Sequence, residues 1–305
     1  MRTLGGSSLR PESMKFDKPP LTIEEQIDLL LARGLVISDR DLARHYFTHL
    51  NYYRIGAYWL PFELNHTSHQ FKPGTTLDAV LNVYLFDREF RLLVMDAIER
   101  IEVSIRAAWA YQMAHRHGAH CHLRRELFNP KWDYGRHYDA LKKEVSRSHE
   151  VFIRHLRKTY DEDLPPLWAL VEVMSFGQLS NWYGNTCYRQ DRNAVAVSYG
   201  LDEKILTSLL HHLTIVRNFC AHHARLWNQE FTIVPALPKQ ELLSLCKTDT
   251  RKIYNTLTLI LYLMDKISPE HHWKKRLMDL LEHHNIDTAA MGFPSDWKVR
   301  PLWVL

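Results

Sequence analysis

The sequence has few cysteines, and none of them are closely spaced. Its four cysteines, Cys121, Cys187, Cys220 and Cys246, form no CxxC pair. This spacing argues against a zinc ribbon and against a disulfide framework, and it fits a reducing compartment. The chain also contains no GxxxxGK[ST] or GxGxxG loop and no HExxH motif. Nucleotide hydrolysis and a structural metal are therefore disfavoured, and we expect no cofactor.

Long hydrophobic runs are missing as well. No stretch approaches the roughly 18 apolar residues that indicate a membrane-spanning helix. The N-terminal segment has no apolar core of the signal-peptide kind and ends in Pro19-Pro20. We therefore expect a cytoplasmic protein that does not span a membrane, with a flexible lead over residues 1–19.

Neither sign of charge is in large excess. The 39 Lys and Arg residues face 35 Asp and Glu residues, for a net charge of +4, and 19 His residues add positive charge that depends on pH. Hydrophobic residues make up 46% of the chain, as in ordinary globular proteins. Because neither an internal repeat nor a shift in composition divides the chain, residues 20–305 are predicted to form one domain.

The hydrophobic pattern is helical throughout. Apolar residues recur at intervals of three and four, most clearly from Leu77 to His115, where we expect a core helix with one break. Thr22 and Glu25 are spaced as a capping box at the start of an earlier helix. With no sustained alternation of period two, the fold class is predicted to be all-α. Further helices are predicted over residues 134–159, 166–184, 189–198, 202–228, 250–267 and 270–284.

Positive charge is concentrated in residues 100–160, which carry 13 Lys and Arg against 6 Asp and Glu. Such a region with interspersed aromatic side chains suits a phosphate backbone and unstacked bases, but a solvated helical face explains it equally well. The aromatic residues are Trp132, Tyr134, Tyr138 and Tyr160, and the cations predicted to bind RNA are Lys142, Lys143, Arg154 and Arg157.

The most informative stretch is LLHHLTIVRNFCAHHARLWN, residues 209–228. As one helix it would gather polar residues on one face and apolar residues on the other. Arginine binds phosphate, asparagine positions a hydroxyl or water, and histidine exchanges a proton near neutral pH, so the polar set suits phosphodiester cleavage. A capping and salt-bridge network near a helix end is the alternative. The polar face holds Arg217, Asn218, His222, Arg225 and Asn228, and the apolar face holds Phe219, Cys220, His223, Leu226 and Trp227.

Arg217, Asn218 and His222 match the R-x4-6-H motif of HEPN domains. The likeness extends to NYYRIGAYWLPF at 51–62, FDREFRLLVMDAIERIEVSIRA at 86–107, LWALVEVMSFGQLSNWY at 167–183 and MGFPSDWKVRPLW at 291–303. Together these blocks resemble the Abi family of abortive-infection proteins, of the AbiD and AbiF type, from about residue 18 to the end. The resemblance implies a HEPN-type helical bundle with additional N-terminal and C-terminal helices, acting in bacterial antiphage defence as a toxin-like ribonuclease.

The resemblance also implies a site formed where two motifs face each other, so a chain with one motif should act as a homodimer. For AbiF-type members it implies a small non-coding RNA partner. RNA supplies its own nucleophile, the 2′-OH, so cleavage requires no metal if the protein orients that group and neutralises the phosphate. We assign Arg217 to the phosphate, Asn218 to orientation and His222 to proton transfer, and we expect 2′,3′-cyclic phosphate and 5′-hydroxyl ends. The alternatives are a catalytically silent module that binds RNA or a protein, and a toxin held inactive by an antitoxin.

Other residues are considered as accessories to this site. Glu102 and Arg106 would flank it if a long helix packs against the motif helix, although their i,i+4 spacing also supports a plain salt bridge. His223 satisfies the looser motif spacing, but its place on the apolar face favours a role in the core or in support of the catalytic residues. Adjacent histidines point to different faces of a helix, which disfavours a metal site. The aromatic cluster Tyr52, Tyr53, Tyr58 and Trp59 suits base stacking, with core packing as the default.

Overall fold

The structure, a computed structural model, describes residues 17–237, 244–247 and 251–304. These residues form helices and three isolated β-bridges, with no strand among them, so the prediction of an all-α fold is confirmed. The chain divides into two compact units, residues 1–81 and 82–305. Because compact units need not be independent folding domains, the single domain over residues 20–305 stays a prediction. Of the flexible lead predicted over residues 1–19, residues 1–16 lie outside the described part of the chain.

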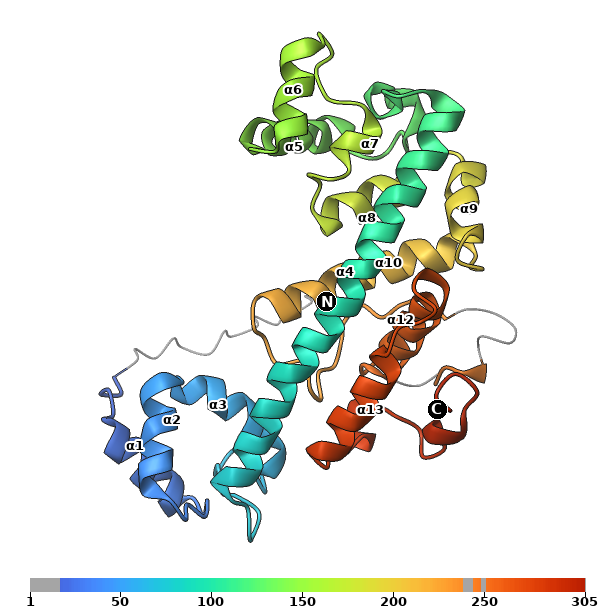
Figure 1. The fold of residues 1–305 in the computed structure, drawn as a ribbon. Coiled ribbons are helices and arrows are strands. Elements are labelled where there is room, and N and C mark those ends of the chain that lie inside the picture. Colours follow the sequence, from blue (N-terminus) through green and yellow to red (C-terminus); the bar gives the residue numbers. More distant parts are fainter. Residues whose placement is uncertain (1–16, 238–243, 248–250, 305) are drawn as a thin grey trace, which may run out of the picture. The chain divides into compact units, whose positions relative to one another are not determined.

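Three short helices make up most of the first unit (Figure 1): α1 spans Ile23–Ala32, α2 spans Arg40–His49 and α3 spans Tyr52–Trp59. A 3₁₀ turn follows over Leu60–Phe62. The predicted capping box is confirmed at the start of α1. There the N–H of Glu25 donates to the Thr22 hydroxyl (3.3 Å), and the N–H of Thr22 donates to the Glu25 carboxylate (2.7 Å).

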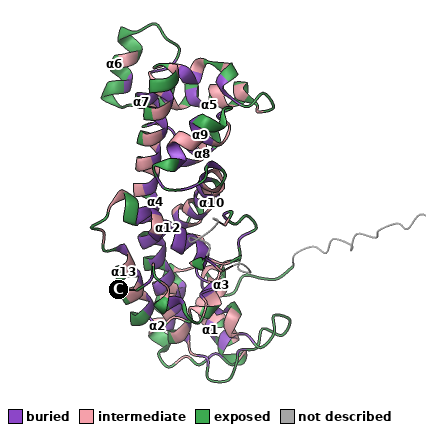
Figure 2. Ribbon diagram, turned by 90° about the vertical axis from the view of Figure 1, so that its right-hand side faces the viewer, coloured by how far each residue is buried: buried purple, intermediate pink, exposed green. Residues whose placement is uncertain are grey.

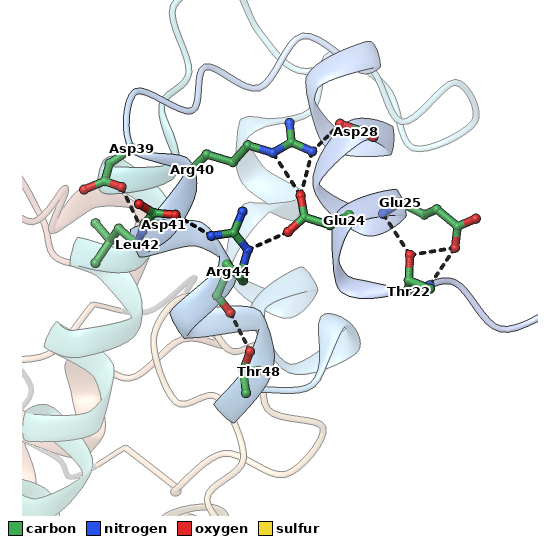
Figure 3. A network of polar contacts seen from close by, with 10 residues as sticks. All are labelled: Thr22, Glu24, Glu25, Asp28, Asp39, Arg40, Asp41, Leu42, Arg44 and Thr48. Carbon is green, nitrogen blue, oxygen red and sulfur yellow. Dashed lines mark hydrogen bonds and ion pairs between the residues drawn. The ribbon is translucent and has the colours of Figure 1, made fainter.

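Ion pairs join α1 to α2 on the surface of the first unit (Figure 3). Glu24 accepts from Arg40 at 2.8 Å and from Arg44 at 2.6 Å, and Arg40 also pairs with Asp28 at 2.7 Å. Exposed pairs of this kind contribute roughly 0 to 1 kcal/mol each. The apolar faces of the two helices therefore supply most of the packing energy. Their buried residues are Ile27, Leu30, Ala43 and Phe47.

The aromatic cluster of α3 divides between core and surface. Tyr58 and Trp59 are buried, so the default of core packing is confirmed for these two residues. Tyr52 is half-buried, and its hydroxyl accepts a hydrogen bond of 2.8 Å from Arg33. Tyr53 is 80% exposed and lies on the surface.

A single long helix, α4, spans Leu77–His117. The predicted break in it is wrong, because the segment contains neither glycine nor proline to interrupt the hydrogen bonds. Its buried stripe agrees with the predicted periodicity. The stripe contains Phe86, Phe90, Val94, Ala97, Ile98, Ile101, Ile105 and Trp109.

Two of the predicted helices are each divided in two. Residues 134–159 form α5 and α6 because Ser148 takes an extended conformation, and residues 166–184 form α7 and α8 because Ser175 is extended and caps a new helix. The bounds are Tyr134–Arg147 for α5, Val151–Thr159 for α6, Leu167–Leu170 for α7, Phe176–Gly184 for α8 and Arg189–Val197 for α9. Short 3₁₀ turns lie at Cys121–Leu123 and Arg125–Leu127.

Two glycines of α8 bring it close to α10, which spans Glu203–Ala221. A Cβ added to Gly184 would lie 3.1 Å from Thr207 Cγ2, and one added to Gly177 would lie 3.4 Å from Thr214 Cγ2. The two pairs run in opposite order along the chain, so the helices are antiparallel. The absence of side chains at these glycines therefore permits a close helix contact that positions α10.

Two further helices are α12, Tyr254–Ile267, and α13, Trp273–His283, and 3₁₀ turns lie at Ala289–Met291 and Trp297–Val299. Most of α12 is buried, as its purple ribbon in Figure 2 shows. It forms part of the hydrophobic core of the second unit.

Candidate active site

The three predicted catalytic residues lie at the C-terminal end of α10. Arg217 and Asn218 belong to its last turns, and His222 is the residue that caps it. The N–H of His222 donates to the Asn218 carbonyl at 2.9 Å, so the two residues lie one turn apart. Arg217 is half-buried, whereas Asn218 and His222 are exposed. The end of the helix thus presents an amide and an imidazole to solvent, and Arg217 directly precedes Asn218 in the chain.

The helix ends at Ala221, seven residues before the predicted end at 228. His223 takes a left-handed conformation (φ 57°), and the N–H of Ala224 donates to the Phe219 carbonyl at 2.9 Å. This pattern terminates a helix. The prediction of a core role for His223 is wrong, because the residue is exposed at this turn, and its role in support of the site stays a prediction.

Arg225 and Asn228 therefore do not extend the polar face of α10 as predicted. Both lie beyond the helix and are half-buried. Asn228 is left-handed (φ 53°), and its side-chain oxygen accepts a hydrogen bond from Lys252. Lys252 also donates to the Ala290 carbonyl at 2.8 Å. Asn228 thus anchors the segment after the motif.

A buried carboxylate that the sequence reasoning missed holds this segment to α4. Asp87 accepts from the backbone N–H groups of Leu226 at 3.1 Å and Trp227 at 2.6 Å. It also forms an ion pair with Arg91, one helical turn away. The sequence could have indicated this carboxylate, because Asp87 and Arg91 are an acid and a base four residues apart on the apolar stripe of α4. Charged residues are rare in such buried positions unless they are paired.

Glu102 and Arg106 of α4 form an ion pair, and Arg217 lies near enough to Glu102 for its charge to act on that carboxyl. Arg106 donates to the Glu102 carboxylate and, at 2.7 Å, to the Met174 carbonyl. Burial raises the pKa of Glu102, while the positive charges of Arg106 and Arg217 lower it in part. Arg106 thus contacts the Glu102 carboxylate directly, whereas Arg217 acts on it through its charge. As far as the described residues show, the buried Nε of Arg106 has no hydrogen-bond partner.

Two other side chains of α10, those of Cys220 and His212, are buried in the core. Burial, with the charge of Asp87 as a second cause, raises the pKa of the Cys220 thiol to about 12, so the thiol is neutral and unsuited to nucleophilic attack. Burial lowers the pKa of His212 to about 4. The His212 ring bonds to the Ile233 carbonyl (2.8 Å) and the Thr256 hydroxyl (2.7 Å). It is a neutral structural histidine.

Histidine pairs and cysteines form no metal cluster in the described part of the chain. No three His, Cys, Asp or Glu side chains among those residues come together as metal ligands would. His211 is exposed while His212 is buried, in agreement with the expectation that adjacent histidines face different ways. All four cysteines are free thiols.

The four cations predicted to bind RNA are exposed on α5 and α6. Lys142 lies 3.3 Å from Asp163, so its charge is partly neutralised. The aromatic residues near them are less available than predicted. Trp132 is half-buried and stacks on His137 (centroids 4.6 Å apart). The Tyr134 and Tyr138 rings stack on each other at 5.8 Å, and only Tyr160 of the four is exposed.

None of the described helices combines the length and apolar character that crossing a membrane requires.

Comparison with known proteins identifies the family. No curated protein and no solved structure matches the chain. The sequence matches the Abi-like protein family over residues 45–228, which includes the motif and three of the four further blocks that carry the resemblance. Since the match covers more than half of the 305 residues, the chain belongs to the Abi-like protein family.

Proposed function

We propose that the protein is a metal-independent endoribonuclease that acts as a toxin-like RNA cleaver in abortive-infection defence. Its membership of the Abi-like family suggests the defence role. The observation that supports the chemistry is the grouping of Arg217, Asn218 and His222 at the end of α10, with the last two exposed. This is a HEPN-type site of the kind that the motif implies.

In the proposed reaction the 2′-oxygen of RNA attacks the adjacent phosphorus. The bond from phosphorus to the 5′-oxygen breaks, leaving a 2′,3′-cyclic phosphate and a 5′-hydroxyl. One group must accept the 2′-OH proton and another must protonate the leaving oxygen. Arg217 stabilises the charge that develops on the phosphate, and Asn218 orients the substrate.

Because each chain offers one His222, a symmetric homodimer would supply both proton-transfer groups. One imidazole would act as base and its counterpart as acid. Glu102 and Arg106 would position Arg217, since the carboxylate attracts both guanidinium groups. A small non-coding RNA is the regulatory partner that we propose beside the RNA substrate. The cytoplasm is the compartment that fits the free cysteines.

The test compares wild-type protein with Arg217→Ala and His222→Ala, both in cells and with total RNA in EDTA. Only wild type should be toxic and should leave cyclic phosphate ends, and removing His222 should slow cleavage about 10²- to 10⁴-fold. His283→Ala is the matched control, because His283 is an exposed histidine on α13. His223→Ala identifies which of the adjacent histidines acts. Equal cleavage by wild type and His222→Ala would refute the proposal.

A catalytically silent RNA-binding module is the second candidate, supported by the exposed cations of α5 and α6. Lys143, Arg154 and Arg157 are exposed and form no ion pair within the described residues. Under this interpretation, wild type and His222→Ala would bind RNA alike and neither would cut it. Charge reversal at these cations would lower the salt dependence of binding.

A further inference from the structure

We propose that α10 carries a second RNA contact, a phosphate-binding pocket at Lys204, Ser208 and His211, and that the exposed stripe from this pocket to His222 is the track of one RNA strand. The inference rests on the proposed function for the identity of the ligand as RNA. It adds a site that sets the length and register of the substrate.

The pocket lies beside the N-terminal half of α10, within the second unit. Its volume is about 610 Å³, inside the range of roughly 300 to 1,000 Å³ typical of ligand sites. The end of α8 and the segment after it form the opposite wall. Its lining includes Gly184, Cys187, Lys204, Thr207, Ser208 and His211.

Three residues with hydrogen-bond donors line the pocket. Lys204 and His211 are exposed, and the side chain of neither forms an ion pair or hydrogen bond with any described residue. The Ser208 hydroxyl accepts from the N–H of Ala236 at 2.9 Å, so its own hydrogen is available for a phosphate oxygen. An ammonium, an imidazole and a hydroxyl are groups that bind phosphate.

The acidic residues nearby do not cancel the charge of Lys204. Glu203 is buried and pairs with Arg189 at 3.3 Å and Arg192 at 3.0 Å. Asp202 accepts from the backbone N–H of Lys204 and lies 3.4 Å from Arg189. Two carboxylates thus face two guanidinium groups, and the ammonium of Lys204 remains as the excess positive charge.

A continuous stripe joins this pocket to the proposed active site. Residues spaced alternately by four and three positions lie on one face of a helix. None of the stripe residues is fully buried, and four of them are exposed. The stripe consists of Lys204, Ser208, His211, Ile215, Asn218 and His222.

The length of the stripe sets the shortest RNA that can contact both Lys204 and His222. At 1.5 Å per residue, the distance from Lys204 to His222 is about 27 Å. A stacked strand advances about 3.4 Å per nucleotide, so about eight nucleotides span it. Short oligonucleotides that occupy the active site therefore cannot reach Lys204.

The test measures binding rather than cleavage, with labelled RNAs of about 4 and about 12 nucleotides added to the full-length His222→Ala protein. In this background Lys204→Ala should weaken the longer RNA about tenfold, lower its salt slope by about one and leave the shorter RNA unaffected. Lys204→Glu should enlarge the effect, and His211→Ala should act in the same direction. Lys275→Ala, an exposed lysine on α13, is the charge-matched control.

Equal effects of Lys204→Ala on both lengths, or no effect on the longer RNA, would overturn the inference. The proposed function is judged separately, by whether wild type cuts RNA. If cleavage is absent but the length-dependent effect of Lys204 is present, the track stands without the nuclease. If cleavage is present and Lys204→Ala binds the longer RNA normally, the nuclease stands without the track.

Discussion

The Asp87 carboxylate accepts a hydrogen bond of 2.6 Å from the backbone N–H of Trp227, a residue 140 positions away. This contact joins the N-terminal third of α4 to the segment that follows His222. It fixes the direction in which the chain leaves α10, and so it limits where the residues after His222 lie. The left-handed turn at His223 lies between the end of α10 and the two residues whose N–H groups Asp87 binds.

Asp87→Ala should lower the free energy of unfolding by about 3 to 5 kcal/mol, because it breaks a buried ion pair by removing the carboxylate that faces Arg91. It also removes the acceptor of two backbone N–H groups. Urea unfolding followed by tryptophan fluorescence measures this loss. Asp41→Ala is the control, since its ion pair with Arg44 is exposed and should contribute under about 1 kcal/mol. Similar losses from both substitutions would contradict this account.

Gly184→Ala should destabilise the contact between α8 and α10 by about 1 to 3 kcal/mol, because the added Cβ would lie 3.1 Å from Thr207 Cγ2. Thr207→Ser removes that methyl group and retains the hydroxyl, which donates to the Glu203 carbonyl at 2.7 Å. The double variant should therefore recover most of the stability. Gly177→Ala, at 3.4 Å from its neighbour, is the milder comparison. A double-mutant cycle without coupling would exclude the steric explanation.

His212 should make the protein less stable in acid. Its pKa is about 4 in the folded state, against 6.5 ordinarily, because burial opposes the charged form. The unfolded chain therefore takes up the proton first, and stability that is fully present above pH 6.5 is lost as the pH falls towards 4. In His212→Gln this part of the pH dependence should disappear. Unfolding measured at intervals from pH 7 to pH 4 gives the difference in slope, and equal slopes would contradict the prediction.

Arg217→Lys should retain RNA binding and lose cleavage about 10²- to 10³-fold. Lysine keeps the positive charge but not the planar fork that can donate two hydrogen bonds to one phosphate. The measurement is single-turnover cleavage at saturating protein, with RNA affinity determined separately. A variant that cuts as fast as wild type would show that Arg217 contributes charge alone.

The sequence by itself determined the elements that depend on local interactions. Periodicity identified α4 and α10 because the burial of one helix face repeats every three or four residues. The capping box at Thr22 and Glu25 was predictable because its partners are three residues apart. The motif spacing placed Asn218 and His222 one turn apart for the same reason.

Only the tertiary structure decided how these elements meet. The end of α10 at Ala221 depends on the left-handed turn at His223, which a helical wheel drawn through residues 209–228 does not reveal. The contact of Asp87 with Trp227, like the approach of Glu102 to Arg217, joins segments far apart in the chain. No local pattern encodes such pairs, because their energy comes from desolvation and packing that exist only after the helices have come together.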